Sequence, residues 1–340
     1  MRFAFTEDQV LFQEAVRDLL AKECPPAAVR DAWAAGAAEA TGGAARRRWQ
    51  KLAEMGVVGM LAPASVGGLG LGEVDLVLPL EECGRAALPE PILETAAVAV
   101  PLLVAAGDDR AGAAAAGDLQ VAVGLGGTGP YVAGATTAGL LILQDGDALH
   151  AVDPAGVVLT PVESLDPTRR LSEIAWTPSP ATRLALSSGA AAAAFAFDRG
   201  ALAAAAILVG LADHMVELAA DYARDREQFG QPIGSFQAVK HLLADALLRI
   251  DFARPAVYRA AWSVAQPGTA EGLRGRDVSM AKAYASDAAV RAARAALQVH
   301  GAIGYTWEHD LHLWMKRAWS LSGAWGDAAW HRRRVGRWLL

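Results

Sequence analysis

The sequence predicts an α+β protein in which two helical domains flank a small β domain. Apolar residues recur at helical spacing in roughly the first hundred residues and again after residue 191. Between about residues 119 and 176, short apolar runs alternate with Gly, Asp and Pro, which is typical of strands and turns. We therefore expect an N-terminal helical domain over 1–117, a short β domain over 118–185 and a C-terminal helical domain over 186–340.

The composition is typical of a globular protein without nucleic-acid partners. The 340 residues are 53% hydrophobic, which is enough for a large core. A net charge of −6 does not favour nucleic acid, because a phosphate backbone requires a concentrated basic face. Cys24 and Cys83 have no companion ligands at metal spacing, so neither a disulfide nor a zinc site is expected. The N-terminus lacks the apolar core of a signal peptide, which favours a cytoplasmic protein.

The N-terminal helices are predicted from caps and periodicity. Thr6 followed by Gln9 resembles a capping box, and the helix it begins should end at Pro25. Further helices are expected over 46–60 and 72–87, separated by the turn-rich segment 63–70.

The middle segment contains a glycine pattern typical of dinucleotide sites, but the residues that follow it do not fit such a site. Strands are expected at 121–123, 140–143 and 157–159. Residues 124–129 satisfy G-x-G-x-x-G after the first of them. A Rossmann turn must open a helix, yet Pro130 and Gly134 follow at once, so a dinucleotide site is not favoured.

Long helices are expected near 200–227, 236–263 and 277–300 in the C-terminal domain. The apolar stretch 189–210 has the length of a membrane span, but Asp198 and Arg199 interrupt it. We therefore predict a buried helix and no membrane span.

The first candidate binding motif lies at a helix corner, residues 221–240. One helix ends there, the chain turns through Gly230 and Gly234, and another helix begins. Such a corner can present Arg226 and Gln228 together with the free N–H groups of the new helix, an arrangement suited to a pyrophosphate. A solvated helix end followed by an ordinary turn explains the same pattern.

The second motif, residues 298–305, ends another helix at Gly301 and Gly304. Glycines at a helix end allow the backbone to approach a ligand closely, or they simply cap the helix.

Together the two motifs resemble the acyl-CoA dehydrogenase family. They read Arg-x-x-Phe-Gly-x-Pro-x-x-x-Phe-Gln and, about 70 residues later, Gln-x-x-Gly-x-x-Gly-Tyr-Thr. The resemblance covers essentially the whole chain and implies FAD as cofactor, in a subunit that grips the ADP part of FAD held by its neighbour. It assigns Arg226 and Gln228 to the pyrophosphate, Phe229, Ile233 and Gln237 to the surrounding wall, and Gln298 and Gly301 to the adenosine side.

The chain departs from the family where the chemistry takes place. The family removes the α-proton of an acyl-CoA with a Glu and transfers the β-hydride to flavin N5, giving a trans-2-enoyl-CoA. Counting without gaps, that Glu falls on Trp325, and its alternative position on an earlier helix falls near Gly200 and Ala201. The family's flavin-covering Thr-Glu-Pro and Trp-x-Thr stretches are missing between 117 and 185. Glu308 and Asp327 remain as carboxylates that the sequence alone cannot place.

Aromatic and imidazole residues are concentrated near the C-terminus. Six of the ten Trp residues lie at 307, 314, 319, 325, 330 and 338, a density typical of packing against a helix or an interface. His residues 300, 309, 312 and 331 lack a coherent ligand spacing, so no metal is expected.

Three hypotheses follow from the resemblance. In the first, the chain is a subunit of an FAD-dependent acyl-CoA dehydrogenase of fatty acid or sterol catabolism, and a homologous partner in a heterotetramer supplies the base. In the second, the enzyme is a homo-oligomer with an unrecognised base such as Glu308. In the third, the chain is a flavin-free scaffold or binding subunit. The catalytic residue and the acyl group stay open.

Overall fold

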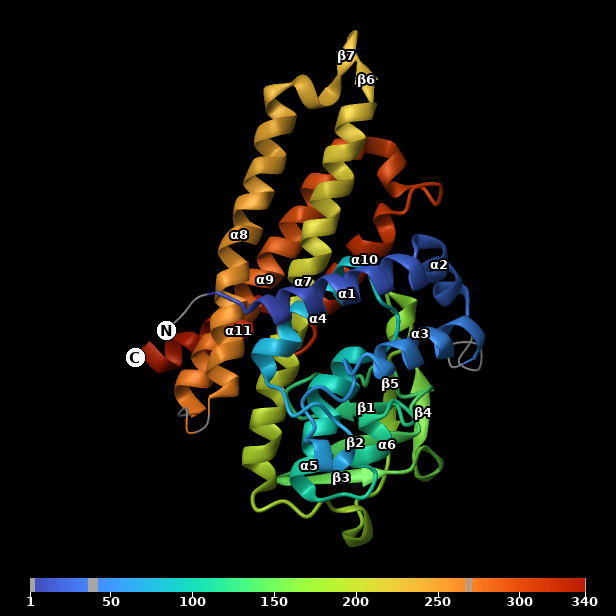
Figure 1. Cartoon of the computed structure of the whole chain (residues 1–340), viewed down its shortest axis with the longest axis vertical. Helices are drawn as coiled ribbons and strands as arrows, with labels where there is room; N and C mark the ends of the chain where they lie inside the picture. Colours follow the sequence, from blue (N-terminus) through green and yellow to red (C-terminus); the bar gives the residue numbers. More distant parts are fainter. Residues whose placement is uncertain (1–3, 36–41, 267, 269–270, 340) are drawn as a thin grey trace.

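The computed structural model describes residues 4–35, 42–266, 268 and 271–339. Figure 1 shows a small sheet region towards one end of the molecule and long helices that extend away from it. The predicted order of helices, strands and helices is confirmed.

The N-terminal helices begin with the predicted capping box. The Thr6 backbone N–H donates to the Gln9 side chain at 2.8 Å, and the Gln9 N–H donates to the Thr6 hydroxyl. The predicted helix end at 60 is wrong, because the chain turns through Gly56 at φ +84°. The helices are α1 (Glu7–Glu23), α2 (Pro26–Ala34), α3 (Gly43–Glu54), α4 (Glu73–Arg85), a π-helical segment (Leu93–Ala99), α5 (Val100–Ala106) and α6 (Ala111–Ala115).

The sheet region holds two small sheets. In the first, β1 (Val121–Gly124) runs parallel to β2 (Leu140–Asp145), and β2 pairs antiparallel with β3 (Ala148–Val152). The second pairs β4 (Val158–Pro161) with β5 (Ser172–Ala175). The sequence did not predict β3 and β5, because Ala-Leu-His-Ala-Val and Ser-Glu-Ile-Ala have few β-branched residues.

The C-terminal domain is a bundle of long helices. The helices are α7 (Gly189–Asp225), α8 (Gln237–Ala265), α9 (Glu271–His300), α10 (Leu311–Gly323) and α11 (Ala328–Leu339). A hairpin of β6 (Glu227–Gln228) and β7 (Gln231–Pro232) joins α7 to α8. It forms the tip of the bundle at the top of Figure 1.

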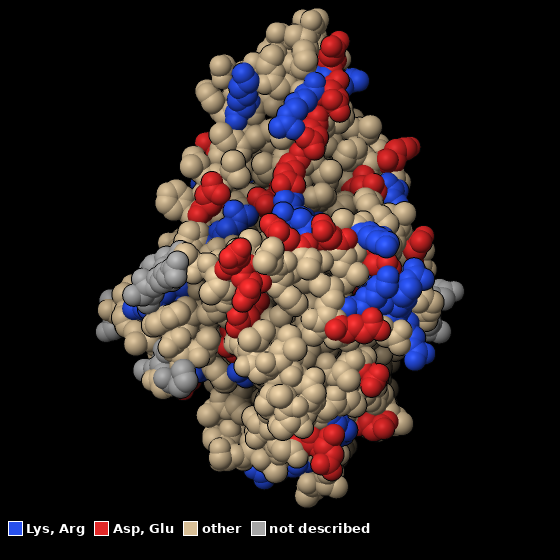
Figure 2. All heavy atoms as spheres, in the orientation of Figure 1, with Lys and Arg blue, Asp and Glu red and all other residues tan. Residues whose placement is uncertain are grey.

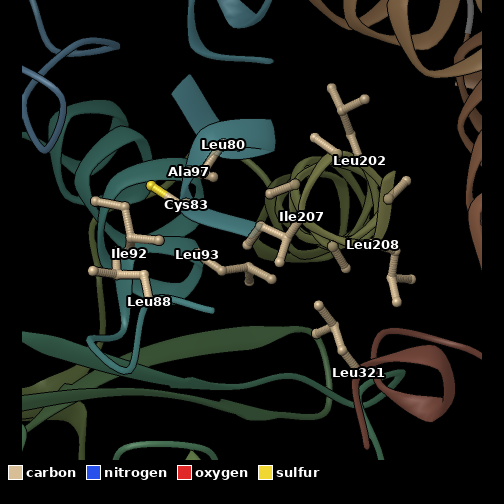
Figure 3. Packing of buried hydrophobic residues seen from close by; sticks show 14 of the residues in the cluster. Leu80, Cys83, Leu88, Ile92, Leu93, Ala97, Leu202, Ile207, Leu208 and Leu321 are labelled. Atoms are coloured by element: carbon tan, nitrogen blue, oxygen red, sulfur yellow. The ribbon is translucent and has the colours of Figure 1, made fainter. Parts of the chain in front are cut away.

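Helix α7 passes through the core, which explains its apolar sequence. By length and composition it could cross a membrane, but 78% of its most apolar window is buried inside the protein. Figure 3 shows Leu202, Ile207 and Leu208 of α7 surrounded by side chains of α4, the π-helical segment and α10. The crossing with α4 is close: a Cβ added to Gly210 would lie 1.9 Å from the Glu81 carbonyl oxygen. The predicted buried helix is therefore confirmed.

Candidate functional site

The predicted pyrophosphate residues lie at the exposed tip of the helical bundle. Phe229 and Gly230 both adopt positive φ, +55° and +77°, which suits the two-residue turn of this hairpin. The Phe229 side chain is 92% exposed and meets only the edge of Phe236, with ring centroids 6.1 Å apart. Phe229 is thus an apolar side chain that stands almost fully in solvent at the tip of the bundle.

The side chains of Arg226 and Gln228 lie at the surface and are not packed into the core. The Arg226 backbone caps α7 through its N–H to Tyr222, while its side chain is exposed and forms no ion pair with the described residues. The Gln228 amide donates only to the neighbouring Glu227 carbonyl. Nearby, α8 begins at the exposed Gln237 without a side-chain cap, and Ile233 is half-buried against the core. A free guanidinium beside an uncapped helix N-terminus has the chemistry of a phosphate site.

The second motif lies at the same end of the bundle. Tyr222 of α7 stacks on His300 of α9, with ring centroids 4.5 Å apart and an interplanar angle of 21°. Gln298 is exposed, and Gly301 adopts φ +64° with open space where a Cβ would stand. The tertiary structure therefore brings Arg226 and Gln298 to neighbouring helix ends.

Gly304 does not have the ligand-facing role that its position suggested. It is buried, and a Cβ there would lie 2.9 Å from Leu297 and 3.1 Å from His300. Gly304 therefore serves the packing of the short 3₁₀ turn after α9. The pKa of His300 is lowered by burial, so its ring is a neutral stacking surface at pH 7.

The two positions where the resemblance places the base lie in direct contact. The Trp325 ring covers Gly200, and a Cβ added to Gly200 would lie 2.3 Å from the Trp325 ring. Trp325 is 3% exposed and also packs against Phe197, with ring centroids 6.0 Å apart. An indole thus fills the space in which either carboxylate would stand, and neither position can accept a proton.

Buried polar groups fix the backbone that carries Trp325. Lys282 is fully buried and donates at 3.0 Å to the Ser286 hydroxyl and to the carbonyl oxygens of Ser322 and Gly326. Burial lowers the pKa of Lys282 to about 7. The His331 Nε2 lies 2.8 Å from the Trp325 carbonyl oxygen, and its Nδ1 lies 3.0 Å from the Ser279 hydroxyl. These contacts hold the loop between α10 and α11 in one conformation.

Ion pairs also fix helix α7, which Trp325 contacts at Gly200. Asp198 of α7 is fully buried and accepts from Arg274 at 2.9 Å and from Arg334 at 2.5 Å. Arg199 pairs with Glu73 at 2.6 Å. The two charges that interrupt the apolar stretch therefore anchor α7 to α9, α11 and α4 immediately before Gly200.

The remaining candidate carboxylates lie away from Trp325. Glu308 is exposed and stands before α10, while Trp325 follows α10; 13 residues of helix span about 20 Å. A hydrogen bond from Thr306 lowers the pKa of Glu308, which makes it a weaker base. Asp327 is exposed and accepts from the Trp330 N–H at 2.7 Å, so it caps α11. Neither geometry favours a catalytic base.

The glycine-rich turn after β1 opens no helix. Its Thr128 hydroxyl donates back to the Leu125 carbonyl at 2.8 Å, and a Cβ added to Gly127 would lie 2.8 Å from Phe197. This loop packs against α7 and does not have the geometry of a dinucleotide turn.

The C-terminal aromatic residues divide between core and surface. Trp314 and Trp325 are buried, and the Trp314 indole N–H donates to the Arg85 carbonyl at 2.8 Å. Trp307 and Trp338 are 64% and 42% exposed. Among the described residues, no group of three or more His, Cys, Asp or Glu is placed to hold a metal ion.

Two models of known protein families match this chain. A model described as acyl-CoA dehydrogenase, C-terminal domain, matches residues 187–340, and one described as acyl-CoA dehydrogenase, N-terminal domain, matches residues 6–113. The chain belongs to the acyl-CoA dehydrogenase family. It is therefore an oxidoreductase of a family whose members depend on FAD.

Relatives of the acyl-CoA dehydrogenase family cover nearly the whole chain. Acyl-CoA dehydrogenase IpdE2 of Mycolicibacterium smegmatis is 33% identical over 315 residues, which span 92% of this chain and 93% of that protein. A chain of the ChsE4–ChsE5 complex from Mycobacterium tuberculosis matches with a TM-score of 0.87 at 27% identity, covering 100% and 99% of the two chains. A steroid acyl-CoA dehydrogenase variant, Tcur3481–Tcur3483, matches with a TM-score of 0.85 at 25% identity over 98% of each chain.

The residues that hold the Trp325 loop were not found from the sequence. Lys282 follows Val278 by four positions within an alanine-rich helix, so it lies on the apolar stripe of α9. A lysine on a buried stripe is a signal of a structural or functional role, because burying an ammonium group requires several acceptors.

Proposed function

We propose that this chain is a subunit of a heteromeric acyl-CoA dehydrogenase and that a homologous partner chain supplies the catalytic base. The observation that carries the proposal is the contact between Trp325 and Gly200. Neither of the two positions that hold a carboxylate in the family carries one here. They are Trp325 and Gly200, and the Trp325 ring fills the space above Gly200.

The tip of the bundle supports a cofactor role that reaches outside this chain. Arg226, Gln228 and Gln298 are exposed, and Arg226 forms no ion pair with any described residue. Together with the uncapped start of α8 they suit the pyrophosphate and adenosine of an FAD held by the neighbouring chain. In such an assembly FAD supplies the hydride acceptor, and this chain binds and orients its ADP half.

The substrate is an acyl-CoA thioester, which is oxidised to its trans-2-enoyl form. A neighbour of closely similar fold is described as a steroid acyl-CoA dehydrogenase, and another forms the ChsE4–ChsE5 complex. We therefore propose a ring-bearing acyl group, as in sterol catabolism, and a cytoplasmic heterotetramer as the working assembly.

The test is reduction of a ferrocenium acceptor by butyryl-CoA and by a steroid-side-chain CoA thioester. The chain is assayed alone and after co-expression with each homologous acyl-CoA dehydrogenase chain of its source genome. We expect turnover only in a mixed assembly, because loss of a general base costs about 10²–10⁴-fold. Replacing the partner's base with Gln should then abolish the reaction.

Two outcomes overturn the proposal. Robust turnover by the lone chain that disappears in Glu308→Gln would establish the homo-oligomeric enzyme. A chain that assembles with a homologue and never acquires flavin would establish the scaffold.

A further inference from the structure

A small cavity of about 50 Å³ lies between the π-helical segment, the loop before β5, α7 and α10. Its wall is mostly apolar, and Figure 3 labels six of the side chains concerned: Cys83, Leu88, Ile92, Leu93, Ile207 and Leu321. Its charged members are Glu90, Glu94, Arg169, Arg170 and Arg317. The cavity has room for a few waters or for one carboxylate group.

Two of these five charges are paired. Glu90 accepts from the Nε of the buried Arg48 at 2.9 Å, and Arg317 pairs with the buried Asp166. Each pair is neutral as a whole. Two arginines and one acid are therefore left facing the cavity without an ionic partner.

The two remaining arginines, Arg169 and Arg170, are half-buried and form no ion pair with any described acid. The Arg169 Nη1 donates at 3.1 Å to the carbonyl and hydroxyl oxygens of Ser320. Arg170 donates to the carbonyl oxygens of Thr168 and Ala32, at 3.0 Å and 3.2 Å. Because a guanidinium has five N–H donors, both side chains keep donors for a ligand.

The remaining acid, Glu94, is buried without a partner. It is 8% exposed, it lines the cavity, and its side chain forms no hydrogen bond or ion pair with another described residue. It lies in the first turn of the π-helical segment, a geometry that is frequent at functional sites. Burial raises the pKa of Glu94, which favours the neutral form. A neutral carboxyl group here is a hydrogen-bond donor that still needs an acceptor.

An open groove of about 610 Å³ adjoins the cavity. The groove and the cavity share five lining residues: Pro89, Glu90, Pro91, Thr137 and Arg170. The outer wall of the groove, at α2 and the start of α3, is formed mainly by alanines: Ala28, Ala32, Ala34, Ala35, Ala44 and Ala45. Such a wall offers contact area to the apolar part of a ligand whose charged end reaches the cavity.

The outer surface near this groove carries both signs of charge. Figure 2 shows basic and acidic side chains interspersed on the face that carries α1 and α3. The two unpaired arginines stand instead at the inner end of the groove, so they do not form part of a surface that attracts anions in general. A ligand that reaches them must be narrow and must carry its negative charge at one end.

We propose that the cavity and the groove bind a carboxylic acid with an apolar body. Its carboxylate accepts hydrogen bonds from Arg169, Arg170 and the Glu94 carboxyl group, and its body lies along the alanines of the groove. Hydrogen bonds of this kind are strong, because a guanidinium matches a carboxylate in shape and in charge. The site is formed within one chain, so its ligand does not depend on the heteromeric function proposed above.

The test is calorimetric titration of the full-length chain with octanoate, which has the proposed charged end and apolar body. We expect saturable binding, and Arg169→Gln and Arg170→Gln should each raise the Kd at least about 10-fold, because each removes a charge-assisted hydrogen bond. The matched control is Arg183→Gln, which changes an exposed arginine outside the cavity and the groove and should keep wild-type affinity. Thermal melting checks that the variants are folded.

Glu94 is tested by two substitutions of similar size. Glu94→Gln keeps an N–H donor and should keep the affinity for octanoate, whereas Glu94→Leu removes the donor and should raise the Kd about 5-fold or more. Both variants lack the acid, so a difference between them reports the hydrogen bond to the ligand. Equal affinity in the two Glu94 variants would overturn the role of Glu94, even where an arginine variant fails to fold.

Two further probes separate the carboxylic acid from other ligands. Octylammonium has the same apolar body with a cationic end, so octylammonium binding that is lost in Glu94→Gln would make Glu94 the ionised receptor of a cation and overturn the proposal. Octanoyl-CoA binding that is weakened as much as octanoate binding by Arg169→Gln would make the cavity part of an acyl-CoA pocket and overturn it as well. Absence of octanoate binding, or equal octanoate affinity in the wild type and both folded arginine variants, has the same consequence.

Discussion

At the scale of single residues, the large Trp325 and the small Gly200 pack together. They occupy the two positions at which the family resemblance places the catalytic base. Only glycine leaves room for the indole, because any Cβ on residue 200 would overlap its ring. The indole fills the space that a carboxylate at residue 200 would need. Under the proposed function, the absence of a base and the gain of this packing contact are one structural change.

We predict that Gly200→Ala destabilises the chain by about 1–3 kcal/mol, the usual cost of overpacking a dense core. Urea unfolding of the two proteins measures this difference. Gly323→Ala is the control, because a Cβ there meets nothing within 4 Å. In the Trp325→Leu variant, Gly200→Ala should lower the free energy of unfolding by less than it does in the wild type. Equal losses in the wild type and in Trp325→Leu would contradict the contact.

Arg226 gives the second prediction at this scale. Its unpaired guanidinium is proposed to meet the FAD pyrophosphate, so Arg226→Ala should weaken FAD retention by the mixed assembly by about 1.5–3 kcal/mol. The flavin-to-protein ratio after gel filtration at decreasing concentrations measures it. Arg224→Ala removes a neighbouring arginine that already pairs with Asp221, and it should retain FAD normally. Equal retention by the two variants would exclude the role of Arg226.

At the scale of elements, the loop between α10 and α11 depends on His331. Burial lowers the pKa of His331 to about 3, and its two ring nitrogens both lie within hydrogen-bond distance of a partner. A histidine whose folded pKa lies below its unfolded value of about 6.5 costs stability as the pH falls from about 6.5 towards 3. Above about pH 6.5 both states are neutral, and the contribution is constant.

We therefore predict that His331→Gln reduces the loss of unfolding free energy between pH 7 and pH 5. The reduction should reach up to about 2 kcal/mol, since one group changes stability by at most about 1.4 kcal/mol per pH unit. Guanidinium unfolding at the two pH values checks it. His241→Gln changes an exposed histidine and should keep the wild-type difference. An unchanged difference in His331→Gln would refute the buried neutral ring.

At the scale of the whole molecule, the residues proposed to contact FAD lie on the exposed tip of the helical bundle. The residues assigned to the pyrophosphate and adenosine point outward, whereas the loop after β1 packs against Phe197. A binding surface that lies open in one chain becomes a pocket only when a second chain covers it.

We accordingly predict that the chain purified alone retains little flavin and that a mixed assembly with a homologue is yellow. Absorbance at the flavin maximum, per chain, with light scattering for mass, measures both properties. A yellow strict monomer would contradict this expectation, because every FAD contact would then have to come from one chain.

The sequence by itself determined the family, the order of helices and strands, and the motif residues. The Thr6 cap, the Arg226 to Gln237 corner and the Gln298 to Gly301 helix end are local patterns, so their conformations follow from neighbouring residues. The middle strands were only partly predicted, because β3 and β5 depend on pairing with β2 and β4 more than on their own residues.

Only the tertiary structure decided how distant positions combine. Trp325 meets Gly200 across more than a hundred residues of chain, and Lys282 donates to carbonyl oxygens at the end of α10 and in the loop that follows it. Such contacts depend on which helix faces pack together and at what distance, and no local sequence pattern specifies that geometry.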